Sequence, residues 1–247
     1  MKKVNSDVAY EHIRKKILSG EYPLGYPLLT EALSAETKVS RTPVREALHK
    51  LKAEGLVTLS PRLGASVKTM DVKEFQEMCE LRLALEGHAA GLAAKNHSQA
   101  DLQEIKLALD GMRELTEKIL GAADEAPFLE DLRRADVRFH IGIMTAAKNE
   151  LMKREILRLH LVNRIVVGPI NLSPPNSTKD ELDTNRSDVL ASHQEIYDAI
   201  VAHDDPLAKQ AMERHIQDII SKSLRQLTGA GKLAPRHLTE DELAYSG

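Results

Sequence analysis

The sequence has a single cysteine, few aromatic residues and no apolar run long enough to cross a membrane. Because Cys79 is alone, the chain cannot form an internal disulfide, which favours a reducing compartment. The N-terminal residues show no pattern of a cleavable signal peptide. These absences predict a cytoplasmic protein that does not bind membranes.

The scarcity of aromatic residues also constrains the core. Only 3% of the 247 residues are aromatic, whereas 42% are hydrophobic, so the core must be built from aliphatic side chains. Leu, Ile, Ala and seven Met suit helix packing, and strand-like patterns are confined to one short region. The length is sufficient for two domains. We therefore expect a mainly α protein with a small sheet.

The charge is distributed unevenly along the chain. The net charge is −3, but the first 70 residues hold 12 Lys and Arg against 7 Asp and Glu, which gives +5 there and −8 for the remainder. A positive region favours contact with nucleic acid. We predict a DNA-binding domain at 1–70, a helical domain at 71–228 and a polar tail at 229–247.

Residues 39–57 have the pattern of an amphipathic helix that begins with cations. Ser40 is a candidate N-cap, so the helix should begin near Arg41, and Gly55 suits its C-terminal end. Its narrow apolar stripe consists of Val44, Leu48 and Leu51. Arg41 and Arg45 lie four residues apart on the opposite face, where an arginine fork could bond guanine or grip phosphate.

The segments on either side complete a winged helix-turn-helix pattern. A shorter helical pattern at 28–37 comes before a tight turn at 38–40, and such a turn places the second helix in the major groove of DNA. After the helix, 56–59 and 65–68 alternate around a turn that contains Gly64, which predicts a two-stranded wing.

The stretch 24–68 resembles the winged-helix domain of the GntR family of bacterial transcription regulators. The matching residues are Gly25, Leu28, Glu31, Leu33, the block 40–48 (S-R-T-P-V-R-E-A-L), Gly55-Leu56-Val57 and Gly64. The resemblance implies that Arg41 and Arg45 contact DNA and that Gly64 enters the minor groove. Our candidate DNA-binding residues are Arg41, Thr42, Arg45, Arg62 and Gly64. The fatty-acid-responsive member of the family has a third DNA-contacting arginine where this chain has Glu31, so that member's operator does not transfer.

Beyond residue 70, helical patterns cover most of the chain. They run over about 71–95, 99–120, 125–147, 149–167, 187–203 and 205–228, and prolines mark 168–186 as a loop or a broken helix. Arg82 lies in the middle of the apolar stripe of the first of these helices. Because an unpaired buried guanidinium is costly, Arg82 should meet either an internal carboxylate such as Glu86 or a bound anion.

Four other ionisable residues occupy apolar stripes on three different helices. Asp136 and His140 lie four residues apart in 125–147, and His193 and His215 lie on the last two helices. Neutral imidazoles and one carboxylate suit a divalent transition metal, with Zn²⁺, Ni²⁺, Mn²⁺ and Fe²⁺ all left open. A metal would also compensate for the burial of these groups.

This second pattern resembles the metal-containing branch of the FadR C-terminal ligand-binding domain, the FCD domain. The matching motifs are D-x-x-F-H at 136–140, A-A-x-N-x-L at 146–151, H-Q-E-I-Y-D-A-I at 193–200 and the histidine at 215. In that family an Asp and three His hold one metal ion, which implies Asp136, His140, His193 and His215 as ligands. Arg82 faces the same cavity in the family, and Asn163 and Arg186 are further candidates for binding the effector.

We therefore expect a homodimeric transcription regulator, a repressor in most of the family. It should bind inverted-repeat half-sites in double-stranded operator DNA and respond to a small carboxylate that chelates the metal while Arg82 binds its charged end. Such a protein would lie on the bacterial nucleoid when it is bound to DNA. Two alternatives stay open: a metal-dependent hydrolase, which would leave the winged helix unexplained, and a DNA-binding protein with a purely structural metal.

Overall fold

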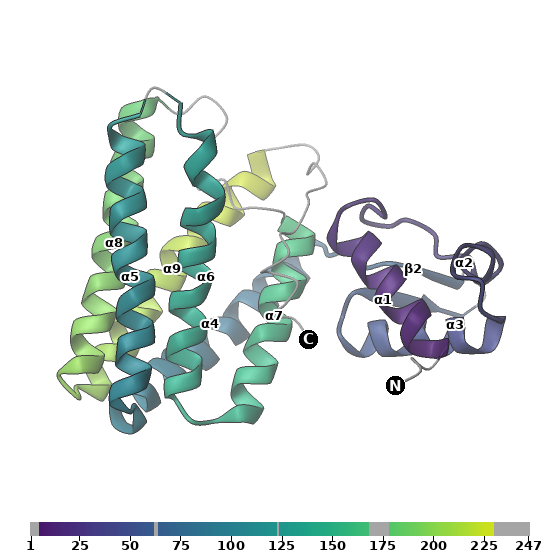
Figure 1. The fold of residues 1–247 in the computed structure, drawn as a ribbon, viewed down its shortest axis with the longest axis horizontal. Helices are drawn as coiled ribbons and strands as arrows, with labels where there is room; N and C mark the ends of the chain where they lie inside the picture. The colour runs from purple at the N-terminus through teal and green to yellow at the C-terminus, as the bar shows by residue number, and fades with distance from the viewer. Residues whose placement is uncertain (1–4, 62–63, 123, 168–177, 230–247) are drawn as a thin grey trace. The chain divides into compact units, whose positions relative to one another are not determined.

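The computed structural model of the chain describes residues 5–61, 64–122, 124–167 and 178–229. Nine helices and two short strands lie in these residues (Figure 1), which confirms the predicted mainly α fold with a small sheet. The described residues form two compact units. The first holds those up to Phe75 and the part of α7 (Glu150–Val167) from Arg158 onward, and the second holds Gln76–Leu157 and the helices after residue 178.

The first unit contains the three-helix pattern and the wing. Its elements are α1 (Asn5–Leu18), α2 (Thr30–Thr37), α3 (Arg41–Ala53), β1 (Val57–Ser60) and β2 (Gly64–Val67). The two strands pair in antiparallel register, so the predicted two-stranded wing is confirmed. This is the winged helix-turn-helix arrangement expected from the sequence.

The apolar stripe of α3 holds this unit together. Val44, Leu48 and Leu51 are each at most 3% exposed and share one apolar cluster with Ile13 of α1 and Leu33 of α2. Burying an aliphatic side chain of this size stabilises the fold by about 1.5–3 kcal/mol. Packing of the stripe leaves the opposite face of α3, with its arginines, to the solvent.

The ends of α2 and α3 follow from local backbone preferences. Lys38 closes α2 with a φ of +57°, and Gly55 follows α3 with a φ of +81°, a left-handed conformation that suits glycine and agrees with the predicted helix end. Ser40 occupies the N-cap position of α3 with extended backbone, as predicted, but its side chain makes no capping hydrogen bond.

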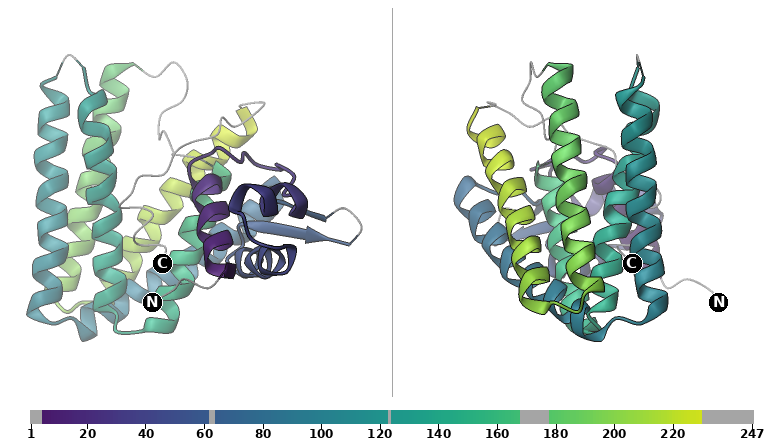
Figure 2. Two further views of the ribbon diagram at one scale, coloured as in Figure 1. Left: turned by 45° about the vertical axis from the view of Figure 1, so that its right-hand side comes forward. Right: turned by 90° about the vertical axis from the view of Figure 1, so that its left-hand side faces the viewer.

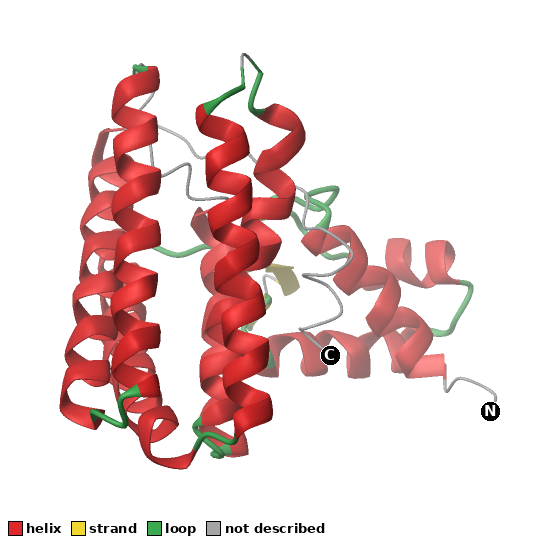
Figure 3. Cartoon of the chain, turned by 60° about the vertical axis from the view of Figure 1, so that its left-hand side comes forward, coloured by secondary structure: helices red, strands yellow, loops and turns green. Residues whose placement is uncertain are grey.

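The second unit is a bundle of long helices. It is built from most of α4 (Val72–Asn96), α5 (Gln99–Leu120), α6 (Ala126–Ala146), α8 (Lys179–Val201) and α9 (Asp205–Gly229), with the first part of α7. In Figure 1, α5 lies beside α6 and α8. The right panel of Figure 2 shows α8 beside α9, and Figure 3 shows that the regular structure of this unit is helical.

One apolar core joins the helices of this unit. Its buried residues include Ile105 on α5, Phe139 on α6, Ile196 on α8 and Ile216 on α9. At Gly142 of α6 an added Cβ would lie 2.9 Å from a side-chain carbon of Ile105, so only glycine allows this close approach of α5. No helix in the described part of the chain is long and apolar enough to cross a membrane.

The start of α8 differs from the prediction. The sequence predicted a loop or broken helix over 168–186, but α8 begins at Lys179, so the prediction is wrong for 179–186. The reason is a capping box: the Thr178 side chain accepts from the backbone N–H of Glu181, and the Glu181 side chain accepts from the backbone N–H of Thr178. The rest of the predicted loop, 168–177, and the predicted tail from 230 to 247 lie outside the described residues.

Candidate functional site

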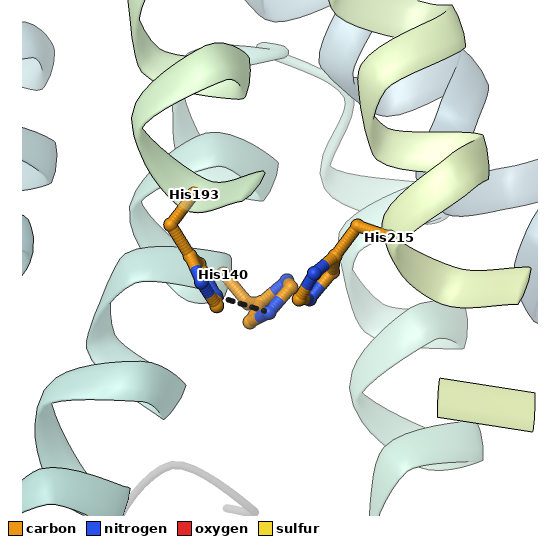
Figure 4. Close-up of side chains that lie close together, drawn as sticks. All are labelled: His140, His193 and His215. Atoms are coloured by element: carbon orange, nitrogen blue, oxygen red, sulfur yellow. Dashed lines mark hydrogen bonds between the residues drawn. The ribbon is translucent and has the colours of Figure 1, made fainter. Parts of the chain in front are cut away.

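Three histidines from three helices meet inside the second unit (Figure 4). His140 of α6, His193 of α8 and His215 of α9 are each at most 5% exposed, and their potential ligand atoms all lie within 4.8 Å of one another. Nε2 of His193 is 3.4 Å from Nε2 of His140. Two imidazole nitrogens bound about 2.1 Å from one zinc ion are at most about 4.2 Å apart. The cluster therefore needs only a small contraction to hold an ion.

Hydrogen bonds fix the orientation of two of these rings. Nδ1 of His193 lies 2.7 Å from the carbonyl oxygen of Val189, which can only accept, so Nδ1 carries the ring proton. The Ser192 hydroxyl donates to the same carbonyl at 2.7 Å, and its oxygen can therefore accept from Nδ1 of His215 at 2.9 Å. Both rings then direct Nε2 toward the cluster, as metal-binding histidines do.

His215 is a buried ring whose Nε2 has no hydrogen-bond partner among the described residues. Burial is the main cause that lowers the pKa of His215 well below its usual range, and charge on the neighbouring His193 and His140 acts in the same direction. The ring is therefore neutral at physiological pH. Leaving such a buried nitrogen unsatisfied costs about 1–3 kcal/mol, which a bound metal ion would relieve.

Asp136 lies one helical turn before His140 and faces the same cluster. Its Oδ1 is 3.2 Å from Nε2 of His193 and 3.9 Å from Nε2 of His140, while 42% of its side chain is exposed. Partial burial acts to raise the pKa of Asp136, but the contact with His193 and the other imidazoles outweigh it and lower the pKa below the usual range. An ionised carboxylate therefore stands beside the three imidazoles.

Arg82 is buried and paired with an internal carboxylate. Its Nε donates to Oε1 of Glu86 at 2.9 Å, and the two side chains are 5% and 1% exposed. This is one of the two partners that the sequence allowed for Arg82. The second oxygen of Glu86 lies 3.9 Å from Nδ1 of His140, so the pair adjoins the histidine cluster. That proximity was not predicted, because it depends on how α4 packs against α6.

The other two candidate effector residues lie in different surroundings. Asn163 is 6% exposed, and its Oδ1 has no hydrogen-bond partner among the described residues, but it belongs to the part of α7 assigned to the first unit. Arg186 donates to Asp183 at 2.9 Å and lies 2.8 Å from Glu125. Its two carboxylate partners tie α8 to the start of α6. Arg186 is therefore paired with carboxylates outside the histidine cluster.

The predicted DNA-binding residues lie on the first unit. Arg41, Thr42 and Arg45 are exposed at the start of α3, and Gly64 is exposed at the start of β2 with a φ of +84°. Arg62 lies outside the described residues.

Two contacts of the candidate residues were not predicted from the sequence. Nη1 of Arg41 lies 3.4 Å from Oε1 of Glu31, and both side chains are about two-thirds exposed, at 65% and 67%. Ser192 was also missed as a partner of His215. Its place directly before His193 was visible, but its contact with a ring on α9 depends on helix packing.

Comparisons with known proteins agree with these two units. Residues 5–67 match the family model described as bacterial regulatory proteins, gntR family, and residues 77–218 match the model of the FCD domain. The second match covers more than half of the chain.

Full-length relatives show the same relationship. The chain is 30% identical over 206 residues to a protein of Paenarthrobacter nicotinovorans named "Probable D-xylose utilization operon transcriptional repressor", covering 83% of each chain. It is 29% identical over 228 residues to the HTH-type transcriptional regulator LutR of Bacillus subtilis, covering 83% of this chain and 96% of LutR. The solved structure of McbR/YncC from E. coli shares the fold, with a TM-score of 0.64 at 19% identity over 91% of this chain and 99% of that one.

Proposed function

This chain belongs to the GntR family of transcription regulators and carries an FCD domain, and we propose that it is a repressor whose operator binding is controlled by a small carboxylate at a metal centre. Regulators of this family bind operator DNA and small effectors and are usually dimers. The family and the relatives of this chain are regulators rather than enzymes, so a hydrolase is no longer a useful alternative. The repressor assignment is supported by the name of the Paenarthrobacter nicotinovorans relative.

The metal centre is the part of the proposal that the geometry supports best. His140, His193, His215 and Asp136 would hold one divalent ion, because three imidazole nitrogens converge beside an ionised carboxylate. The single observation that carries this is the buried Nε2 of His215, which faces the other rings without a hydrogen-bond partner in the described part of the chain. A bound metal would supply a Lewis-acidic centre for chelating a carboxylate ligand. The donor set does not select among Zn²⁺, Ni²⁺, Mn²⁺ and Fe²⁺.

Arg82 would provide the charge that selects an anionic effector. Its guanidinium is buried, and a planar fork of N–H donors suits a carboxylate. Glu86 holds Arg82 in place by accepting a hydrogen bond from its Nε at 2.9 Å. Asn163, with a buried Oδ1 that has no hydrogen-bond partner among the described residues, and Arg186, which pairs with Glu125, are further proposed effector contacts.

DNA binding would use the exposed start of α3 and the wing. We assign Arg41, Thr42 and Arg45 to the major groove and Gly64 and Arg62 to the wing contact, with two copies of the chain on two half-sites of an inverted repeat. Effector binding would favour one arrangement of the dimer and so change how well both half-sites fit. The proposed location is the cytoplasm, on the nucleoid when bound.

The experiment tests whether a carboxylate that binds at the histidine cluster changes operator binding. We would screen C2–C6 mono- and dicarboxylates against the Zn²⁺-loaded protein by thermal shift, and then measure operator release by each compound that binds. His193→Ala should leave a folded protein that binds the operator but no longer responds, whereas His203→Ala, an exposed histidine of the same unit, should respond normally. If His193→Ala only unfolds the domain, or if no carboxylate acts on the wild type, the metal is structural and the sensing proposal fails.

A further inference from the structure

The carboxylate of Glu86 lies between two groups of the proposed site. Its Oε1 accepts from Nε of Arg82 at 2.9 Å, and its Oε2 is 3.9 Å from Nδ1 of His140. The side chain is only 1% exposed, so water contributes little to its solvation. A carboxylate buried to this extent has to be satisfied by protein groups. Its position connects Arg82 to the histidine cluster.

A comparison of the three histidines indicates what Glu86 does. On the Nδ1 side, His193 faces the carbonyl of Val189 at 2.7 Å and His215 faces the hydroxyl of Ser192 at 2.9 Å. On His140 the corresponding oxygen is Oε2 of Glu86. At 3.9 Å this contact is about 1 Å longer than a hydrogen bond, so a small movement would close it.

Nε2 of His140 is the ring nitrogen that faces the cluster. It lies 3.4 Å from Nε2 of His193, which is itself 3.2 Å from Oδ1 of Asp136. As a metal ligand, Nε2 of His140 must present a lone pair, so the ring proton must then be on Nδ1. Oε2 of Glu86 is placed to accept it there.

We propose that Glu86 is a positioning residue of the metal centre, which accepts the Nδ1 proton of His140 and thereby makes Nε2 the ligand atom. Arg82 holds the same carboxylate in place through Oε1, so one side chain serves both the metal ligand and the effector-binding group. This inference rests on the proposed metal centre and goes beyond it by assigning a role to a residue outside the ligand set.

The first experiment measures Zn²⁺ affinity by competition with a chromophoric chelator, using the full-length protein. Glu86→Gln should weaken zinc binding about 10–100-fold, the usual effect of losing a partner behind a metal-binding histidine. The matched control is Glu80→Gln, the same substitution at an exposed position of α4, which should bind zinc like the wild type. Circular dichroism of the metal-free proteins checks that both variants are folded.

A second measurement requires no variant. Long-range ¹H–¹⁵N spectra of histidine-labelled wild-type protein report which ring nitrogen carries the proton. His140 should carry it on Nδ1 in the zinc-loaded protein. This result tests whether Nε2 is the ligand atom, whereas the zinc affinity of Glu86→Gln tests whether Glu86 supports that ligand. A zinc-loaded His140 that carries its proton on Nε2 would overturn the proposal even if Glu86→Gln fails to fold.

The outcomes separate this inference from the proposed function. If the wild type and His193→Ala bind zinc equally weakly, the metal centre itself is wrong and the role of Glu86 falls with it. A second outcome is that the wild type binds one zinc ion and His193→Ala binds none. If folded Glu86→Gln then binds zinc as tightly as the wild type, only the role of Glu86 is overturned.

Discussion

Arg82 and Glu86 form an ion pair with an Nε–Oε1 distance of 2.9 Å, in which the side chains are 5% and 1% exposed. Both lie on α4, one helical turn apart, where apolar residues would be expected to face the core. The cost of burying two charges is met by their contact with each other and by further partners. The fold of α4 and the proposed site therefore depend on the same two side chains.

Removal of one member of this pair should be strongly destabilising. We expect Arg82→Met to lower the free energy of unfolding by about 3–5 kcal/mol, because Glu86 then stays buried without its cation. The double variant Arg82→Met/Glu86→Met should recover most of this loss. Arg214→Met removes an exposed pair with Glu195 and should cost less than about 1 kcal/mol. Urea denaturation of the four proteins measures this, and equal losses for Arg82→Met and Arg214→Met would contradict it.

Metal binding should stabilise the second unit. A ligand that binds only the folded state at a free concentration of about 100 times its Kd adds about 2.7 kcal/mol, so Zn²⁺ should raise the Tm and a chelator should reverse the rise. His215→Ala should abolish the effect, and His203→Ala should retain it. Calorimetry with measured metal content checks this. An unchanged Tm after confirmed removal of bound metal would be inconsistent with the proposed centre.

The pH dependence of stability should include a contribution from Asp101. Its burial acts to raise the pKa, but hydrogen bonds from Lys148 and Ser98 outweigh this and lower the pKa from 3.8 to about 2. Because the pKa is lower in the folded state, the stabilisation is complete above about pH 4 and is lost as the pH falls toward 2. Asp101→Asn should therefore be less stable than the wild type at pH 6, by a margin that shrinks toward pH 2. A margin that stays constant in urea titrations over this range would refute the assignment.

Arg45 should contribute to sequence-specific binding. It is exposed on α3 one turn after Arg41, and a bidentate contact to guanine is worth about 1–3 kcal/mol. Arg45→Ala should weaken operator binding by this amount and relax the preference at one base position, whereas Arg138→Ala, an exposed arginine of the second unit, should bind normally. Fluorescence anisotropy with operator variants measures both effects. An equal loss on random DNA would make Arg45 a phosphate contact instead.

Local patterns predicted much of the fold. The apolar stripe of α3, the left-handed position at Gly55 and the two strands of the wing could be read from spacing and residue type, because each depends on neighbours within a few residues. The start of α8 was missed because prolines at 169, 174 and 175 suggested a longer break, whereas the Thr178 capping box begins the helix at Lys179.

The site was less accessible to sequence reasoning because it depends on packing between helices. Helical spacing placed His140, His193 and His215 on inward faces, and the structure brings these rings together. The spacing could not show that Ser192 on α8 faces a ring on α9, or that Glu86 adjoins His140. It also could not distinguish Arg186, which pairs with Asp183 on α8 and with Glu125 just before α6, from a residue that faces a ligand.

The most direct test of the central claim is selection of genomic fragments by the purified full-length protein at physiological salt, followed by sequencing. We predict that the wild type recovers a short inverted repeat beside one or a few operons. The double variant Arg41→Ala/Arg45→Ala should lose that enrichment. A carboxylate should release the repeat from the wild type but not from His193→Ala. Recovery of only salt-sensitive binding without a shared sequence, equal for the wild type and the double arginine variant, would contradict the account.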